Sequence, residues 1–403
     1  SKVLCRHIYR NYRGFEWGSL MTDDFDSEFV MPEAPSVVST GFRRFNQGKI
    51  LSGVVSFALF SVSLLLVLYA VNILSEGVLG PDPELSQRHQ QFIELSGFDN
   101  VTTSGSGVDV CIVDTGIDLS HPDLEHIQLE GWNDFVQNRG EPYDDEGHGT
   151  AMAGILVAEN LLLGIAPDVN LHIAKAITSS GTGTDSVIAS AVDWCTDSGV
   201  DIISLSLGGQ QGINLIFLST DELEDAVNRA INQGIYVVAA AGNDGGENDD
   251  GDVSSPGSVE DVICVGAIDI DGSIWRNSSV GDNNWQVWPP KAARSDPDRK
   301  PELVAPGERI PMLNAQIGEA KSLYAWGSGT SGSTVWVTGA IAHMLELRPD
   351  LSHNGTGSNR QTVEDVKQWI EESVVRQDGQ TGHDEYYGYG RLQVDALIAL
   401  ATT

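Results

Sequence analysis

The chain has 403 residues, of which 41% are hydrophobic, and a formal net charge of −34 at pH 7. This length and composition suit one large globular domain preceded by a non-globular segment. The charge argues against nucleic-acid partners, because a phosphate backbone repels an acidic surface. The chain has only seven lysines and 57 Asp and Glu residues. Repulsion among so many carboxylates destabilises the fold and is screened at high salt, so we expect a halophilic protein.

The front of the chain contains a tail and a candidate membrane span. Residues 1–49 carry seven basic and six acidic side chains, and we expect a partly disordered cytoplasmic tail. Residues 50–74 carry no charge and exceed the about 20 residues that cross a bilayer as a helix. Arg43, Arg44 and Lys49 precede this span, so the positive-inside rule predicts that the N-terminus is cytoplasmic and the rest lies outside.

A cleaved signal peptide is the alternative for residues 50–74, and it would yield a secreted protein. The apolar region of a signal peptide has only about 7–15 residues and ends at an Ala-x-Ala site. The span here is longer, and no such site follows it. We therefore predict a permanent single-pass anchor followed by a linker over residues 75–84.

Apolar runs typical of buried parallel strands recur in the rest of the chain, at residues 108–113, 170–174, 201–205, 235–241 and 262–267. Helical patterns alternate with them, for example at residues 185–194 and 221–233. This alternation predicts βαβ units and an α/β fold with a mostly parallel sheet. We expect the domain to fill residues 85–403.

Three Gly- and Thr-rich turns supply an Asp, a His and a Ser, in that order. Asp114 follows the first predicted strand, and the carboxyl ends of strands are where functional groups gather in α/β sheets. His148 and Ser331 each precede a helical pattern, so both should lie at helix N-termini. This set predicts a nucleophilic hydrolase, in which the serine attacks, the imidazole transfers the proton and the carboxylate orients the imidazole.

Asn243 follows the strand at residues 235–241, where its amide is placed to donate a hydrogen bond to a tetrahedral intermediate. Other hydrolase classes fit less well. An aspartic protease needs two Asp-Thr-Gly segments, and the chain has one. An esterase usually shows a Gly-x-Ser-x-Gly elbow and the order Ser, Asp, His. Cys111 and Cys264 lie in apolar strands and are expected to be buried thiols, and Cys195 is expected to end a helix.

Together these segments resemble the subtilisin-like serine proteases, the subtilase family, from about residue 85 to the C-terminus. The resemblance implies a three-layer α/β sandwich with a mostly parallel sheet. It further implies an Asp-His-Ser triad, in which Ser331 is the nucleophile, His148 the general base and then acid, and Asp114 the orienting carboxylate. Asn243 and the Ser331 backbone N–H would form the oxyanion hole.

The resemblance also implies a mode of substrate binding. A peptide would add as a strand between Ser206-Leu207-Gly208 and Gly181-Thr182-Gly183, recognised mainly through its backbone. The acidic, lysine-poor composition resembles haloarchaeal members of the family. The chain departs from the family pattern at Val335, where Pro is usual, and at Trp336, where His is usual. Only about ten positions separate the apolar span from the first matched residues, too few for a folding propeptide.

The expected function is therefore a membrane-anchored, extracytoplasmic serine endopeptidase acting on proteins or peptides, with no cofactor in the chemistry. The alternative is a non-catalytic surface or assembly protein that retains the fold, because fold does not imply function. A structural calcium ion is a further option, since an acidic loop supplies oxygen ligands, although we favour a solvated loop and assign no metal ligands. The loop carboxylates are Asp244, Glu247, Asp249, Asp250 and Asp252.

Overall fold

The computed structural model describes residues 47–75, 82–160, 162–207, 222–246, 251–285, 292–317 and 322–403. The predicted span lies within one continuous helix, α1 (Gln47–Ser75). Its segment Val54–Val71 is long and apolar enough to cross a membrane, a property that signal sequences share. The predicted tail up to residue 46, and residues 76–81 of the predicted linker, lie outside the described residues.

The domain after α1 is built on a seven-stranded parallel sheet with strand order β2-β3-β1-β4-β5-β6-β7. Its strands are β1 (Asp109–Asp114), β2 (Gly131–Asp134), β3 (Asn170–Lys175), β4 (Ile202–Leu205), β5 (Tyr236–Ala240), β6 (Ile263–Ile268) and β7 (Leu303–Pro306). Apart from β2 they are buried almost throughout, as expected for parallel strands covered on both faces. The predicted α/β class with a mostly parallel sheet is confirmed.

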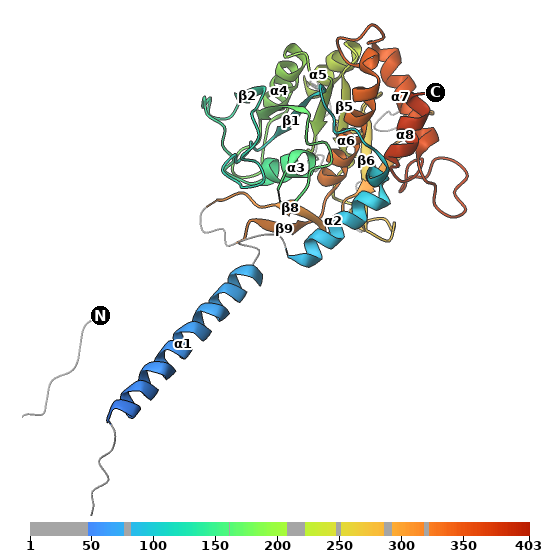
Figure 1. The fold of residues 1–403 in the computed structure, drawn as a ribbon. Coiled ribbons are helices and arrows are strands. Elements are labelled where there is room, and N and C mark those ends of the chain that lie inside the picture. Colours follow the sequence, from blue (N-terminus) through green and yellow to red (C-terminus); the bar gives the residue numbers. More distant parts are fainter. Residues whose placement is uncertain are drawn as a thin grey trace, which may run out of the picture. The chain divides into compact units, whose positions relative to one another are not determined.

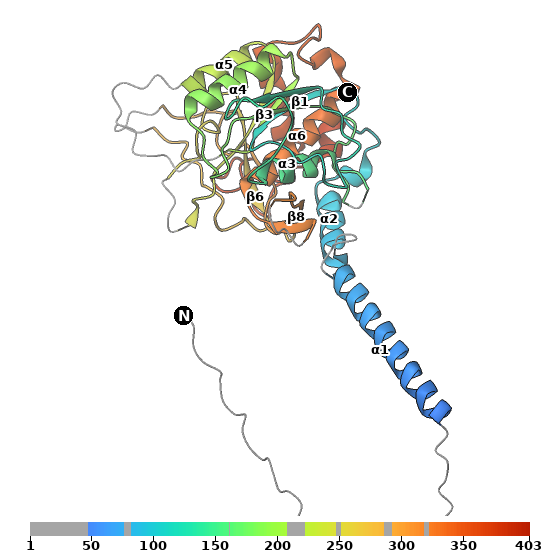
Figure 2. The same cartoon turned by 90° about the vertical axis from the view of Figure 1, so that its left-hand side faces the viewer.

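Helices cover both faces of this sheet (Figures 1 and 2). On one face, α4 (Asp185–Asp197) and α5 (Glu222–Asn232) pack against each other. On the other face, α3 (His148–Val157) packs against α6 (Thr330–Leu347). The residues of α3 after His148, and those of α6 up to Leu345, are all buried. Helices that are apolar on all sides belong in the interior, and these two carry the active-site candidates.

Shorter elements complete the domain, and they were not predicted from the sequence. They are α2 (Pro83–Leu95), η1 (Phe98–Asn100), the antiparallel pair β8 (Ile310–Leu313) and β9 (Tyr324–Gly327), η3 (Pro349–Leu351), α7 (Arg360–Ser373) and α8 (Val394–Ala401). The Asp82 carboxylate accepts a hydrogen bond from the Glu84 N–H at 2.8 Å and caps α2. The predicted domain start at residue 85 therefore falls inside a helix.

The two departures from the family pattern lie within α6. Val335 is inside the helix, which continues through it without interruption. Trp336 packs against two rings at the start of the domain, with ring centroids 6.3 Å from Phe92 in α2 and 5.5 Å from Phe98 in η1. Trp336 thus fastens the first helix of the domain to its central helix.

Cys111 of β1 and Cys195 of α4 form a disulfide. The prediction that Cys111 is a buried thiol is therefore wrong. The two residues are 84 positions apart, and only the packing of α4 against β1 brings them together. Cys264 is free and buried, as predicted.

Candidate active site

Asp114 and His148 meet at the carboxyl edge of the sheet. Asp114 is the last residue of β1 and is fully buried, and His148 is the first residue of α3. The Asp114 carboxylate oxygens lie 2.8 and 2.9 Å from Nδ1 of His148. The Thr115 N–H donates to the same carboxylate at 2.7 Å. The carboxylate therefore favours the tautomer that carries its proton on Nδ1, which leaves Nε2 as the acceptor.

The first turn of α3, which carries His148, is held by two side chains that the sequence analysis did not assign. Asp144 accepts hydrogen bonds from the backbone N–H of Thr150 at 2.9 Å and from its hydroxyl at 2.6 Å. Thr115 Oγ1 accepts one from the Gly149 N–H at 2.7 Å. A Cβ at Gly149 would lie 2.2 Å from the backbone that faces it, so the close approach requires glycine. Asp144 lies three residues before the N-cap Gly147, so the sequence offers no helix-capping signal for it.

The electrostatics of this turn favour a charged imidazole. Burial disfavours the imidazolium, but the Asp114 charge and hydrogen bond, with the charges of Glu146 and Asp144, outweigh it and raise the pKa of His148 to about 9. The Glu146 carboxylate also accepts the backbone N–H of His148 at 2.8 Å. The His148 side chain is 35% exposed, so a substrate can reach it. An imidazole must be neutral to accept a proton, so a general base at this position would need alkaline pH.

Ser331 lies in the first turn of α6. Its hydroxyl donates to the Ser206 carbonyl at 3.1 Å, and the Ser206 hydroxyl donates to the Ser331 carbonyl at 3.0 Å. Within the described part of the chain no hydrogen bond joins Ser331 to His148. The two helices that carry these residues pack against each other, and catalytic hydrogen bonds often form only once substrate is bound. The Ser331 hydroxyl would have to turn away from Ser206 to reach Nε2.

Asn243 follows β5 and is held by the N-terminus of α6. Its Oδ1 accepts hydrogen bonds from the Thr330 N–H and hydroxyl, both at 3.0 Å. The amide NH₂ has no partner among the described residues, and Asn243 is exposed. The Ser331 N–H likewise has no acceptor in that part of the chain. Two unpaired donors therefore lie at the positive end of the α6 dipole, as the predicted oxyanion hole requires.

The predicted substrate-binding segments follow β3 and β4, the two strands that flank β1 in the sheet. Gly181-Thr182-Gly183 is exposed, and its Gly181 carbonyl and Gly183 N–H have no partner among the described residues. Ser206 is buried and Leu207 partly buried, whereas Gly208 lies outside the described residues. Both segments thus extend from the sheet edge at which β1 ends in Asp114.

The acidic loop considered for calcium is described only in part, because Glu247, Asp249 and Asp250 lie outside the described residues. Asp244 accepts a hydrogen bond from the Ser279 hydroxyl, and Asp252 forms an ion pair with Arg294 at 2.7 Å. Both described carboxylates therefore have protein partners.

A parallel α/β sheet with an Asp–His pair at its carboxyl edge, beside a helix that begins with a serine, fits a serine hydrolase. Residues 105–390 match the model of the Subtilase family. Subtilisin DY from Bacillus licheniformis is 33% identical over 295 residues, which cover 72% of this chain and 91% of the relative. The chain therefore belongs to the subtilase family of serine proteases.

Two further comparisons agree with this assignment. Serine protease AprX from Bacillus subtilis (strain 168) is 36% identical over 272 residues, which cover 62% of this chain and 60% of the relative. A crystal structure of a cold adapted subtilisin-like serine proteinase matches with a TM-score of 0.55 and 25% identity, over 73% of this chain and 91% of that one. The match to this structure agrees with the predicted subtilisin-like fold.

Proposed function

We propose that the protein is a serine endopeptidase that hydrolyses peptide bonds through an acyl-enzyme. The observation that carries the proposal is the buried Asp114 carboxylate, bonded through both oxygens to His148 beside the helix that opens with Ser331. Ser331 Oγ attacks the peptide carbonyl while Nε2 of His148 takes its proton and then returns it to the leaving amine. Asp114 holds Nδ1–H and stabilises the imidazolium. No cofactor takes part in these steps.

The unpaired donors support the rest of the mechanism. The Asn243 NH₂ and the Ser331 N–H would stabilise the oxyanion of the tetrahedral intermediate. The substrate would add as a strand between Ser206-Leu207-Gly208 and Gly181-Thr182-Gly183, and the free backbone groups at Gly181 and Gly183 support this pairing. Main-chain recognition of this kind predicts broad specificity towards protein and peptide substrates.

Labelling with a fluorophosphonate probe tests the proposal, using the full chain in detergent and high salt. We expect the wild type to label and Ser331→Ala and His148→Ala to lose the label while keeping their circular dichroism. Ser333→Ala is a matched control, because the Ser333 hydroxyl is buried in the same helix and donates to the carbonyls of Ala305 and Pro306. A folded wild type that never labels would overturn the proposal and favour the non-catalytic alternative.

We further propose that residues 50–74 are a permanent signal anchor, with the N-terminus cytoplasmic and the protease domain outside. Arg43, Arg44 and Lys49 before the span support this orientation. The Cys111–Cys195 disulfide supports an extracytoplasmic domain, because disulfides persist in oxidising compartments. After carbonate extraction we expect the full-length chain in the membrane pellet, with its domain open to protease added outside cells. A shortened soluble form would show that the span is cleaved.

We also propose that the protein belongs to the acidic, halophilic members of its family. The described part of the domain contains three lysines, Lys175, Lys300 and Lys367, and each of them is fully buried. The lysines serve internal ion pairs, so the described surface of the domain presents no lysine ammonium group to offset its carboxylates. The absence of nucleic-acid partners is part of the same proposal, because this surface would repel phosphate groups.

A further inference from the structure

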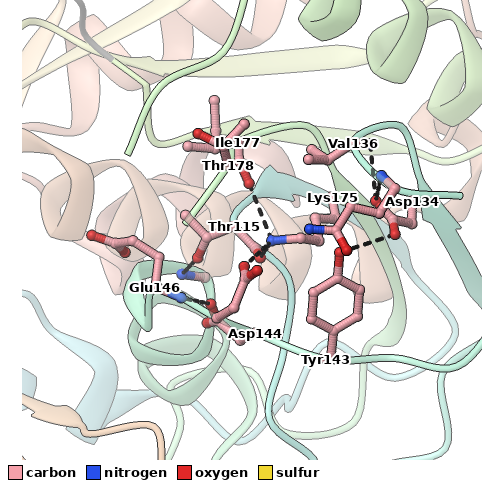
Figure 3. A network of polar contacts seen from close by, with 12 residues as sticks. Thr115, Asp134, Val136, Tyr143, Asp144, Glu146, Lys175, Ile177 and Thr178 are labelled. Atoms are coloured by element: carbon pink, nitrogen blue, oxygen red, sulfur yellow. Dashed lines mark hydrogen bonds and ion pairs between the residues drawn. The ribbon is translucent and has the colours of Figure 1, made fainter. Parts of the chain in front are cut away.

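A polar network is centred on the buried Lys175 (Figure 3). Lys175 is the last residue of β3, and the sheet register pairs it directly with Asp114 at the end of β1. Its side chain is fully buried. Burying an ammonium group is unfavourable unless its N–H groups are satisfied, so the partners of Lys175 explain how the fold accommodates it.

The Lys175 ammonium donates one hydrogen bond to each of three separate segments. The first acceptor is the carbonyl of Thr115, the residue after Asp114. The second is the Asp145 carboxylate at 2.7 Å, in the loop that leads into His148. The third is the Ile177 carbonyl at 3.1 Å, at the start of the loop that carries the predicted substrate segment. One ammonium group thus contacts the turn after Asp114, the loop before His148 and the start of the loop that carries the predicted substrate segment.

Further contacts restrict movement of the ammonium group. The Tyr143 ring lies with its centroid 4.7 Å from Nζ of Lys175. The Tyr143 hydroxyl donates to Asp134, the last residue of β2, at 3.0 Å. Asp134 also accepts the backbone N–H groups of Val136 at 2.9 Å and Arg139 at 3.0 Å. The aromatic face is therefore held in place by a carboxylate that is itself fixed by the backbone.

We propose that Lys175 is a positioning residue of the active site, which holds the Asp114 turn, the His148 loop and the substrate loop in one arrangement. This inference rests on the proposed protease function. Lys175 does not act on substrate, because its three hydrogen bonds go to protein acceptors. Without the ammonium, Asp145 and the carbonyls of Thr115 and Ile177 would lose their shared partner. The backbone hydrogen bonds from Ala176 and Ile177 to the Asp114 carbonyl would remain, so the segments would be held less tightly rather than released.

The test compares Lys175→Met with Lys300→Met in the full chain at high salt. Lys300 is a matched control, because it is also fully buried and donates to a carboxylate, Glu302, at 2.7 Å and to a backbone carbonyl, Val262, at 2.6 Å. It lies just before β7, the edge strand, and three strands, β4, β5 and β6, separate β7 from β1, which ends in Asp114. Both variants lose a buried ion pair, but only Lys175→Met removes hydrogen bonds to the active-site loops.

At a temperature where both variants are folded, we expect Lys175→Met to lower kcat about 100-fold on a small ester and on a peptide, because misplacement by about 1 Å costs this much. Lys300→Met should show no comparable fall. The low-field NMR proton of the Asp114–His148 hydrogen bond should be lost only in Lys175→Met. An unchanged kcat in folded Lys175→Met, or an equal fall in Lys300→Met, would overturn the inference.

Asp145→Asn keeps the inference testable if Lys175→Met does not fold, because it preserves the side-chain shape and removes the charge. We expect a fall in kcat of about tenfold, because the Asn oxygen still accepts from Lys175 but without the charge that strengthens the hydrogen bond, and an unchanged kcat would again overturn the inference. Failure of the protease proposal is recognised separately. In that case the wild type takes no fluorophosphonate label, whereas the NMR signal still reports whether Lys175 positions Asp114 and His148.

Discussion

At the scale of single residues, His148 is surrounded by carboxylates. Asp114 is bonded to its Nδ1, Glu146 to its backbone N–H, and Asp144 to the same helical turn. This environment raises the pKa of His148 to about 9. The charged ring cannot accept the Ser331 proton, so we predict that kcat/KM rises with pH through a midpoint near 9. A pH–rate profile on a small ester measures this midpoint.

Glu146→Gln should lower the midpoint, since it removes a charge that favours the imidazolium, whereas Glu372→Gln on α7 should not. A midpoint at the ordinary imidazole value of about 6.5, insensitive to Glu146, would contradict the prediction. The pH dependence of folding stability has the opposite sign to that of kcat/KM. A pKa raised on folding stabilises the native state fully below about 6.5, and this contribution disappears as the pH passes about 9.

Asn243 provides a second prediction at this scale. Asn243→Ala removes the unpaired NH₂ donor, and we expect kcat to fall about 10²–10³-fold with little change in KM, the loss known for one oxyanion donor in subtilisin, a relative of this chain. Steady-state kinetics on a peptide measure the effect. Thr330→Ser is the control, because it keeps the hydroxyl and N–H that hold Asn243. A change confined to KM would argue against the oxyanion role.

At the scale of elements, the central helix α6 is joined to α2 and η1 by Trp336, which contacts Phe92 and Phe98. We predict that Trp336→Ala lowers the free energy of unfolding by about 3–5 kcal/mol, the usual cost of truncating a buried aromatic ring. Trp336→Phe should cost much less, because the buried indole N–H has no hydrogen-bond partner within the described part of the chain. Chemical denaturation in high salt compares the variants, and equal losses would contradict this account.

At the scale of the whole molecule, the net charge of −34 dominates. Repulsion among exposed carboxylates opposes the compact state and weakens as the Debye length falls from about 10 Å at 0.1 M to about 3 Å at 1 M salt. We predict that the denaturation midpoint rises steeply with NaCl or KCl over this range. Sucrose is the control, because it stabilises compact states without screening charge. A midpoint that does not respond to salt would argue against halophilic adaptation.

Local sequence determined much of the sheet and the chemical groups at its edge. The strand and helix patterns were visible because buried parallel strands are continuous apolar runs and α4 and α5 have an amphipathic period. Asp114 and His148 were placed correctly at the end of a strand and the start of a helix, since strand ends and Gly-rich turns are local features. The catalytic roles of these residues remain predictions.

Other features depended on tertiary packing. The Cys111–Cys195 disulfide joins residues 84 positions apart and exists because α4 lies on β1. The Lys175 network draws partners from three loops, and the Trp336 cluster joins the first helix of the domain to its central helix. No periodicity in the sequence reports such contacts. These contacts depend on which helices and strands are neighbours in space. The packing of the whole hydrophobic core determines that arrangement.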